Sequence, residues 1–186
     1  IGKRFDAINT ESTETSRRDY RELLFRASGM DENISGVILF DETLRQASAD
    51  NTLLKDIILK TGALPGIKVD KGVASINDSE EVLTGGLDGL EERCAEYESL
   101  GAKFTKWRAV IKIGENMPSD NCIEANMQAL ADYAKIVQQS NMVPIVEPEV
   151  LMDGEHSADA CFDATSRCLN SLFANLESKR VNIKGV

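Results

Sequence analysis

The stretch FTKWRAVIKI (residues 104–113) begins the part of the chain that decides the fold. It is an apolar run interrupted by charged residues, and a second run, VPIV (143–146), follows it after one helical pattern. Runs rich in β-branched and aromatic residues, bounded by Gly, Asp or Asn, are typical of strands. A strand, a helix and a second strand in succession predict a βαβ unit with parallel strands.

The same alternation continues on both sides of this unit. Further strand-like runs cover residues 36–40, 66–70 and 181–183, and helical patterns lie around residues 20–27, 87–100, 123–137 and 161–176. The first three helices are expected to end at Gly29, at Gly101 and near Asn141, and the third is expected to begin at Ser119. The polar stretch 75–86 is expected to be a long loop. The pattern therefore predicts an α/β fold with a parallel sheet.

Two architectures contain such a sheet: an open, doubly wound sheet and a closed barrel. A doubly wound nucleotide-binding fold carries a glycine-rich phosphate turn directly after its first strand. The chain has no G-x-G-x-x-G or P-loop motif, and its nearest approach, TGG at 84–86, follows a polar stretch instead of a strand. The sequence therefore favours a (β/α)8 barrel, the TIM-barrel class.

Composition narrows the classes of partner. The 186 residues include 21 Lys and Arg and 31 Asp and Glu, which gives a formal net charge of −10. A chain of this charge repels phosphate backbones, so we expect no nucleic-acid partner. No apolar run approaches the roughly 20 residues of a membrane span, so we expect no membrane insertion.

Histidine and cysteine usage bears on metals and on the cellular compartment. The single histidine, His156, excludes a zinc site built on several imidazoles. None of the four cysteines forms a C-x-x-C pair, and Cys161 and Cys168 lie two helical turns apart in an apolar pattern. We therefore expect packed, reduced thiols and a cytoplasmic protein.

Charged side chains within the strand runs are the most informative feature. Side chains on a strand alternate between its two faces, so three pairs each share a face: Lys68 with Asp70, Lys106 with Arg108, and Glu147 with Glu149. Each pair lies toward the C-terminal end of its run, the end that carries the active site of a parallel barrel. A strand face that is exposed to solvent would explain one such charged pair. It explains less well why charged pairs occur on three successive strands. The three positive and three negative charges can neutralise one another, and together they indicate a site for an anionic substrate and proton transfer.

At these residues the chain resembles class I fructose-1,6-bisphosphate aldolases. The resemblance rests on GVILF (36–40), GIKVDKG (66–72), GLDGL (86–90), KWR (106–108), KIGE (112–115) and IVEPE (145–149). It runs from Ile1 to about Asp153 and thins to a helical pattern over residues 157–178. It implies a (β/α)8 barrel that cleaves fructose 1,6-bisphosphate to dihydroxyacetone phosphate and glyceraldehyde 3-phosphate through a lysine Schiff base, without a metal or other cofactor.

The resemblance also implies roles for individual residues. Glu147 matches the family's general acid/base in carbinolamine dehydration, Glu149 its acidic neighbour, and Lys106 the lysine beside the Schiff-base amine. The basic residues that match substrate- or phosphate-contacting positions are Lys3, Arg4, Arg17, Lys68 and Arg108. General chemistry agrees with these roles, because a nearby cation lowers the pKa of a nucleophilic lysine and loss of hydroxide needs a positioned acid.

The strand count leads to an expectation about the whole protein. Five strand runs match strands two to six of the family barrel, whereas a complete barrel needs about 250 residues. We therefore expect residues 1–186 to be a single domain, a partial barrel that lacks the first strand and the last two to three strands. The Schiff-base lysine is then expected just after Val186, and the fragment alone is expected to be inactive.

Lys184 is the other lysine near this position, where the family commonly has Glu. If the strand expected at 181–183 continues, the side chain of Lys184 points to the opposite face from Gly185 and from a lysine four residues beyond it, where the nucleophile is expected. We therefore expect Lys184 not to be the nucleophile.

Other readings of function stay open. Family members also bind cytoskeletal and adhesin partners, so the alternative is a non-catalytic protein that binds phosphate ligands or such partners on an aldolase scaffold. Metal-dependent aldol chemistry is disfavoured by the solitary His156. The resemblance further implies a homotetramer with a sugar bisphosphate as its small-molecule ligand.

Overall fold

Four parallel strands form the centre of the computed structural model, which describes residues 1–186. They are β1 (Gly36–Leu39), β2 (Leu64–Lys68), β5 (Phe104–Ile111) and β6 (Val143–Val150), in that order across the sheet. Every neighbouring pair of these strands is parallel. The expected α/β class with a parallel sheet is confirmed.

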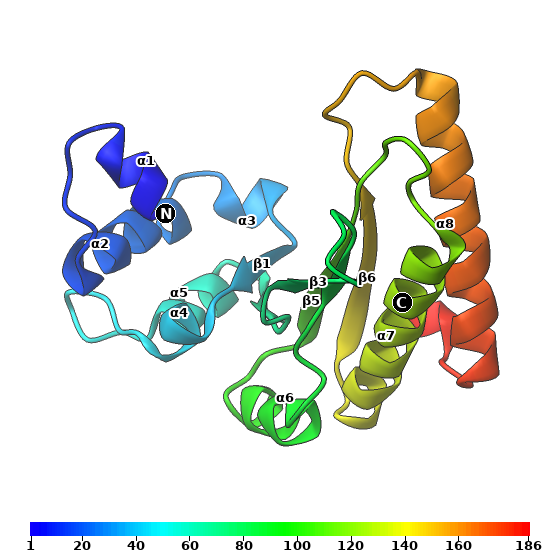
Figure 1. Cartoon of the computed structure of the whole chain (residues 1–186). Coiled ribbons are helices and arrows are strands. Elements are labelled where there is room, and N and C mark those ends of the chain that lie inside the picture. Colours follow the sequence, from blue (N-terminus) through cyan, green and yellow to red (C-terminus); the bar gives the residue numbers. More distant parts are fainter.

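Helices connect the strands and pack on the sheet (Figure 1). Those along the sheet are α4 (Asp41–Arg45), α5 (Leu54–Lys60), α6 (Leu90–Ser99), α7 (Asp120–Gln139) and α8 (Ala158–Ser178), and those before β1 are α1 (Gly2–Asp6), α2 (Glu14–Phe25) and α3 (Met30–Asn33). In Figure 1, α7 and α8 stand side by side next to β6, whereas α1 to α3 lie on the far side of β1. None of the helices combines the length and the hydropathy needed to cross a lipid bilayer.

The core lies between the sheet and its helices, and β5 shows how the sequence builds it. Thr105, Trp107, Ala109 and Ile111 are completely buried, while the residues between them are more exposed. The ring of Trp107 packs on that of Tyr133 in α7, with centroids 5.3 Å apart. The expected apolar face of α7 is buried at every position: Ile123, Met127, Leu130, Ala134 and Val137. The strand alternation therefore sends one face of β5 into the core and leaves the other free for a site.

The helix ends follow local capping chemistry. Ser119 caps α7, as expected, because its hydroxyl accepts a hydrogen bond from the Cys122 N–H at 3.1 Å. Gly101, with φ of +100°, follows the end of α6 as expected. The expected end of the first helix at Gly29 is wrong: α2 ends at Phe25, since Arg26 leaves the helical conformation and Gly29 instead precedes α3.

The expected long loop at 75–86 is also wrong, because this segment forms most of an antiparallel hairpin. Its strands are β3 (Val73–Ser75) and β4 (Val82–Thr84). The buried Asn126 of α7 satisfies the hairpin backbone: its amide donates to the Val82 carbonyl at 2.8 Å, and its oxygen accepts from the Thr84 N–H at 3.4 Å. The strands themselves, VAS and VLT, carry β-branched and apolar residues, and α7 supplies partners for two backbone groups of β4.

The expected fifth strand at 181–183 is absent, and a short 3₁₀ helix, η1 (Ile183–Gly185), occupies this region. The Asn182 side chain accepts from the Lys184 N–H at 3.2 Å, while the Gln138 side chain bonds to the backbone of Asn182 and Gly185. These side-chain bonds satisfy the backbone locally and replace a strand ladder. The parallel sheet consequently has four strands instead of five.

The cysteines provide a test of this packing. All four are free; Cys161 is half-buried and the others are buried. Burial raises the pKa of Cys94 and of Cys122 to about 11, so both thiols are almost fully protonated at pH 8. Of the four cysteines in residues 1–186, we expect iodoacetamide to modify Cys161 alone in the native full-length protein at this pH, and all four after unfolding, as measured by peptide mass spectrometry. Equally fast native labelling of Cys94 and Cys161 would show that the packing is wrong.

Candidate active site

The face of the sheet opposite the core is open to solvent and changes character along the strands. Near the strand starts it is apolar, with exposed Ile38, Leu64 and Val143. The ring of Phe104 lies over Gly66 on this face, so closely that a Cβ at Gly66 would lie 2.3 Å from ring atoms. Toward the strand ends the face becomes charged, which places polar chemistry at the C-terminal edge of the sheet.

Three ion pairs occupy this charged edge. Lys68 pairs with Asp70, Lys106 Nζ lies 2.8 Å from Glu147 Oε2, and Arg108 Nη1 lies 3.1 Å from Glu149 Oε2. The last two pairs bridge β5 and β6 diagonally, because the residues in direct register are Arg108 and Glu147. All six charges that the sequence alternation placed on strand faces are therefore partnered, and the structure brings them together.

The register also places two cations next to each other. Lys68 on β2 and Lys106 on β5 are direct neighbours across the ladder, in strands that lie about 4.8 Å apart. Two adjacent ammonium groups repel one another unless anions balance them. Asp70 and Glu147 supply that balance, and the two neighbouring ammonium groups make this edge suited to an anionic ligand.

Burial differs between the carboxylates in a way that bears on chemistry. The Asp70 side chain is 6% exposed and the Glu147 side chain is 30% exposed. Each carboxylate has one buried oxygen without a hydrogen-bond partner, and in Glu147 this is Oε2, the oxygen that lies 2.8 Å from Lys106 Nζ. Lys106, at 27% exposure, is accessible to a ligand together with Glu147. A partly exposed carboxylate held 2.8 Å from an ammonium group is suited to take up or deliver a proton at a bound substrate.

Residues of the core hold the two strands that carry these pairs. The Tyr133 hydroxyl lies 2.6 Å from the Thr105 hydroxyl and donates to the Ile145 carbonyl at 3.3 Å. Burial raises the pKa of Tyr133, so the phenol stays protonated and available as a donor. Tyr133 therefore contacts both β5 and β6 one residue before Lys106 and two before Glu147.

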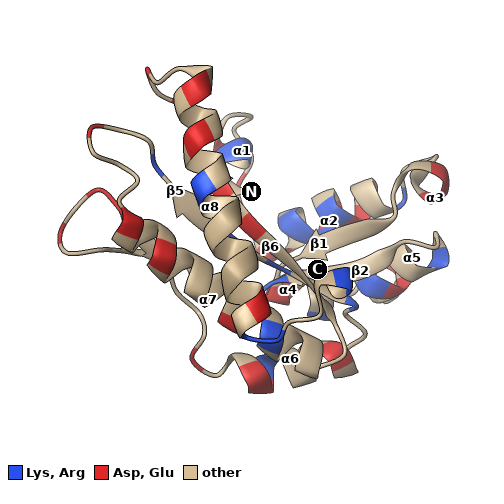
Figure 2. Ribbon diagram, turned by 90° about the vertical axis from the view of Figure 1, so that its right-hand side faces the viewer, with Lys and Arg blue, Asp and Glu red and all other residues tan.

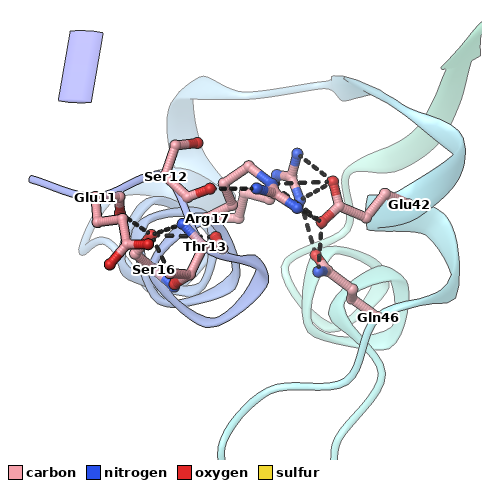
Figure 3. Close-up of polar contacts among 8 residues, drawn as sticks. Glu11, Ser12, Thr13, Ser16, Arg17, Glu42 and Gln46 are labelled. Atoms are coloured by element: carbon pink, nitrogen blue, oxygen red, sulfur yellow. Dashed lines mark hydrogen bonds and ion pairs between the residues drawn. The ribbon is translucent and has the colours of Figure 1, made fainter. Parts of the chain in front are cut away.

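Arg17 lies in a separate network between α2 and α4 (Figure 3). Its guanidinium donates to both carboxylate oxygens of Glu42, with Nη2 2.8 Å from Oε1, and its Nη1 donates to the Ser12 carbonyl at 2.8 Å. Gln46 donates to the same carboxylate at 3.0 Å and accepts from Arg21 at 2.8 Å. No hydrogen bond or ion pair joins this network to the three strand pairs.

The Arg17 network predicts a pH effect on stability. Hydrogen bonding from Arg17 lowers the pKa of Glu42 below its ordinary value of 4.5. A lowered carboxyl pKa stabilises the fold above the ordinary pKa, and the contribution disappears as the pH falls through the lowered native value. We expect Glu42→Gln to lower the urea midpoint at pH 7 and to have much less effect near pH 3, by circular dichroism. The exposed Glu155→Gln variant serves as the control, and an equal deficit at both pH values would contradict this account.

The remaining basic candidates lie apart from the strand pairs. Lys3 and Arg4 are exposed on α1, and neither makes an ion pair. Lys184 is exposed in η1 at the end of the sheet where β6 begins, because Gln138, five residues before β6, bonds to both sides of it. Lys184 is not in a strand, so the argument from the alternation of strand faces does not apply to it. Its position away from Glu147 still leads us to expect that Lys184 is not the nucleophile.

Arg93 is a residue at this site that the sequence did not single out. It lies on α6, and its guanidinium donates to the backbone carbonyls of Val69 at 2.9 Å and Gly86 at 2.5 Å. Val69 separates Lys68 from Asp70 in the chain. The sequence carries no motif for this contact, because its partners are backbone atoms that only the fold brings within reach of α6.

Figure 2 shows where the chain's excess of acidic residues lies. Acidic positions are spread along α6, α7 and α8, outside the sheet. The charged edge of the sheet, by contrast, holds cations and anions in equal number. The fold and this site together define a barrel-type α/β protein with a balanced charged cluster at the C-terminal ends of its strands.

Comparison with known proteins identifies the family. A family model described as "Glycolytic: Fructose-bisphosphate aldolase class-I" matches residues 1–186. The chain is 49% identical to a probable fructose-bisphosphate aldolase class 1 of Xanthomonas campestris, over 100% of this chain and 56% of that protein. It is 48% identical to fructose-bisphosphate aldolase 4, cytosolic, of Arabidopsis thaliana, over 100% of this chain and 47% of that protein. The chain belongs to the class I fructose-bisphosphate aldolase family, and it spans about half the length of these relatives.

A solved structure extends the match to three dimensions. Fructose-bisphosphate aldolase from Plasmodium falciparum, in a ternary complex with TRAP and a small-molecule inhibitor, matches this structure with a TM-score of 0.97 at 45% identity. The match covers 100% of this chain and 54% of that one. The (β/α)8-barrel class expected from the sequence is thereby confirmed.

Proposed function

We propose that the full-length protein cleaves fructose 1,6-bisphosphate to dihydroxyacetone phosphate and glyceraldehyde 3-phosphate, and that this chain supplies acid–base and phosphate-binding residues of the site. The observation that supports this most strongly is the cluster of Lys68–Asp70, Lys106–Glu147 and Arg108–Glu149 pairs at one sheet edge. It occurs in a chain that matches the aldolase family model over its whole length.

Glu147 is the proposed general acid/base. Cleavage through a Schiff base requires a lysine to add to the substrate ketone and the resulting carbinolamine to lose its hydroxyl group as water. A carboxyl group close to that hydroxyl can deliver the proton it needs. Glu147 is partly exposed and faces the same side of the sheet as Lys106, so it can reach a substrate held there. Glu149, paired with Arg108 on the next turn of the pleat, is its proposed acidic partner.

Lys106 has two proposed effects. Its charge disfavours the protonated form of a nearby amine, which makes a neighbouring lysine a better nucleophile. Its ammonium group also holds Glu147, at 2.8 Å, in one position relative to β5. The Schiff-base lysine itself is proposed to lie in the sequence after Val186 of the full-length protein, and residues 1–186 are proposed to be the central part of its barrel, inactive in isolation.

The five basic residues proposed to contact the substrate differ in their surroundings and in their ion-pair partners. Lys68 and Arg108 lie at the charged edge, where they are the proposed contacts to substrate oxygens and phosphate. Lys3 and Arg4 are exposed and make no ion pair, so both are available to a phosphate. Arg17 stays a predicted phosphate contact, although in the structure its guanidinium is bound by Glu42 and Ser12.

Properties of the whole protein are proposed from its relatives. One relative is named a cytosolic aldolase and another, from Spinacia oleracea, a cytoplasmic isozyme, which supports a cytoplasmic location here. A homotetramer without a cofactor is proposed from family membership. The solved Plasmodium falciparum aldolase is in complex with TRAP, so binding to adhesin or cytoskeletal partners is proposed as a secondary property.

A coupled assay of the full-length protein tests the proposed activity. Formation of triose phosphate from fructose 1,6-bisphosphate is followed with and without a metal chelator. We expect cleavage that the chelator does not affect. Tight binding of the bisphosphate without cleavage would overturn the proposed aldolase activity and favour the non-catalytic alternative. Loss of activity in the presence of the chelator would overturn the proposed metal-free mechanism.

A further inference from the structure

Arg93 of α6 connects two backbone segments at the edge of the proposed site. Its Nη1 donates to the Val69 carbonyl at 2.9 Å and its Nη2 to the Gly86 carbonyl at 2.5 Å. These carbonyls belong to the continuations of β2 and β4 beyond the regular strands. The planar fork of an arginine holds two acceptors in fixed directions, which a lysine ammonium group does not do.

The two segments are already close to one another. The Lys71 N–H donates to the Gly85 carbonyl, and the Gly85 N–H donates to the Gly72 carbonyl, both at 2.9 Å. At Gly86 a Cβ would come within 3.0 Å of the Lys71 nitrogen and 3.3 Å of the Trp107 ring. Arg93 therefore completes a tightly packed connection between the end of β2, the hairpin and the core beneath β5.

The Val69 carbonyl has a direct geometrical link to the charged edge. Val69 is 1% exposed, and its side chain faces the core, while those of Lys68 and Asp70 on either side face the site. The direction of the Val69 carbonyl fixes the peptide plane that leads to Asp70. Asp70 has one oxygen on Lys68 and the other buried without a hydrogen-bond partner, so Lys68 is its ion-pair partner. A rotation of the 69–70 peptide would move Asp70 and release Lys68.

We propose that Arg93 is a positioning residue: by holding the Val69 and Gly86 carbonyls, it sets the Asp70 carboxylate that directs Lys68 toward the substrate. This inference rests on the proposed role of Lys68 in binding a sugar bisphosphate. The guanidinium hydrogen bonds of Arg93 both go to backbone carbonyls, so we expect its effect on binding to pass through Lys68.

A double-mutant cycle in the full-length protein tests this route. Arg93→Lys keeps the charge but loses the fork, and we expect it to raise KM for fructose 1,6-bisphosphate about tenfold with kcat nearly unchanged. In a Lys68→Met background the same substitution is expected to have no further effect on KM. An equal rise in KM in both backgrounds, or no rise in either, would overturn the proposal.

Arg167→Lys is the matched control. Arg167 is also a helical arginine that donates to a backbone carbonyl outside its helix, that of Pro118 at 3.0 Å, but it lies on α8 and contacts no residue of the charged edge. We expect its KM to equal that of the unsubstituted protein. A rise in KM as large as that of Arg93→Lys would mean that the effect is general destabilisation, which would also overturn the proposal.

Chemical labelling of lysine amines does not depend on catalysis, so it tests the positioning role of Arg93 independently of the proposed aldolase activity. Trace acetic anhydride modifies exposed amines, and mass spectrometry gives the rate at Lys68 relative to Lys60, which lies on α5 away from the site. We expect Arg93→Lys to change the relative rate at Lys68 several-fold, because the ammonium loses its fixed partner. An unchanged rate would overturn the positioning by Arg93. A changed rate in a protein that cleaves no bisphosphate would uphold the positioning and reject the aldolase activity.

Discussion

Glu147→Gln in the full-length protein is expected to lower kcat for cleavage of fructose 1,6-bisphosphate by about 10²–10⁴-fold, the usual contribution of a general acid or base. The amide has the same shape as the carboxyl group but cannot deliver a proton to the leaving hydroxyl. KM is expected to change little, because Lys68 and Arg108 still hold the substrate. Steady-state kinetics with a coupled triose phosphate assay measures both constants.

Glu80→Gln is the control for loss of an ion pair as such. Glu80, in the turn between β3 and β4, pairs with Lys112, which directly follows β5; the two side chains are 67% and 46% exposed, and the pair is not one of the three at the charged edge. We expect its kcat to stay within about twofold of the unsubstituted protein, as for a surface ion pair of little energetic weight. If kcat of Glu147→Gln fell no further than kcat of Glu80→Gln, Glu147 would not be the proton donor.

Trp107→Ala is expected to lower the free energy of unfolding by about 3–5 kcal/mol, the range for loss of a large buried aromatic side chain. Trp107 is completely buried between β5 and α7, and its ring packs on Tyr133 at a centroid distance of 5.3 Å. A cavity there would loosen the strand that carries Lys106 and Arg108. Trp107 is the only tryptophan in the chain, so its substitution removes the chain's tryptophan fluorescence. The loss is therefore measured by urea unfolding followed by far-ultraviolet circular dichroism.

Trp107→Phe separates packing from hydrogen bonding at this position. The indole nitrogen of Trp107 is buried and has no hydrogen-bond partner, so a phenyl ring gives up no polar contact. We expect a smaller loss, about 1–2 kcal/mol, from the volume alone. Equal losses for Trp107→Phe and Trp107→Ala would show that the ring contact with Tyr133 contributes little.

The sequence predicted those features that depend on strand alternation. The period of two along residues 104–111 separates Lys106 and Arg108 from the buried Trp107, and no tertiary information is needed for that separation. Parallel pairing then brings equivalent strand ends to one edge, which is why the charged residues of three runs meet. Capping chemistry likewise located the start of α7 at Ser119.

The features that sequence reasoning missed depend on contacts between distant segments. The hairpin at 73–84 packs on α7 through Asn126, whose side chain bonds to the backbone of Val82 and Thr84, and nothing in the hairpin's own sequence shows that partner. Helix α5, with seven residues, is too short for its periodicity to distinguish it from a strand. The site contact of Arg93 and the binding of Arg17 by Glu42 join residues that are 24 or 25 positions apart, so only the fold reveals them.

Borohydride trapping with dihydroxyacetone phosphate tests the central claim most directly. The full-length protein is incubated with the ketose phosphate and sodium borohydride, digested, and analysed by mass spectrometry. The account predicts one reduced adduct on a lysine beyond Val186, with Lys106 and Lys184 unmodified, and much slower adduct formation in Glu147→Gln. No adduct, or an adduct on any lysine of residues 1–186, would contradict it.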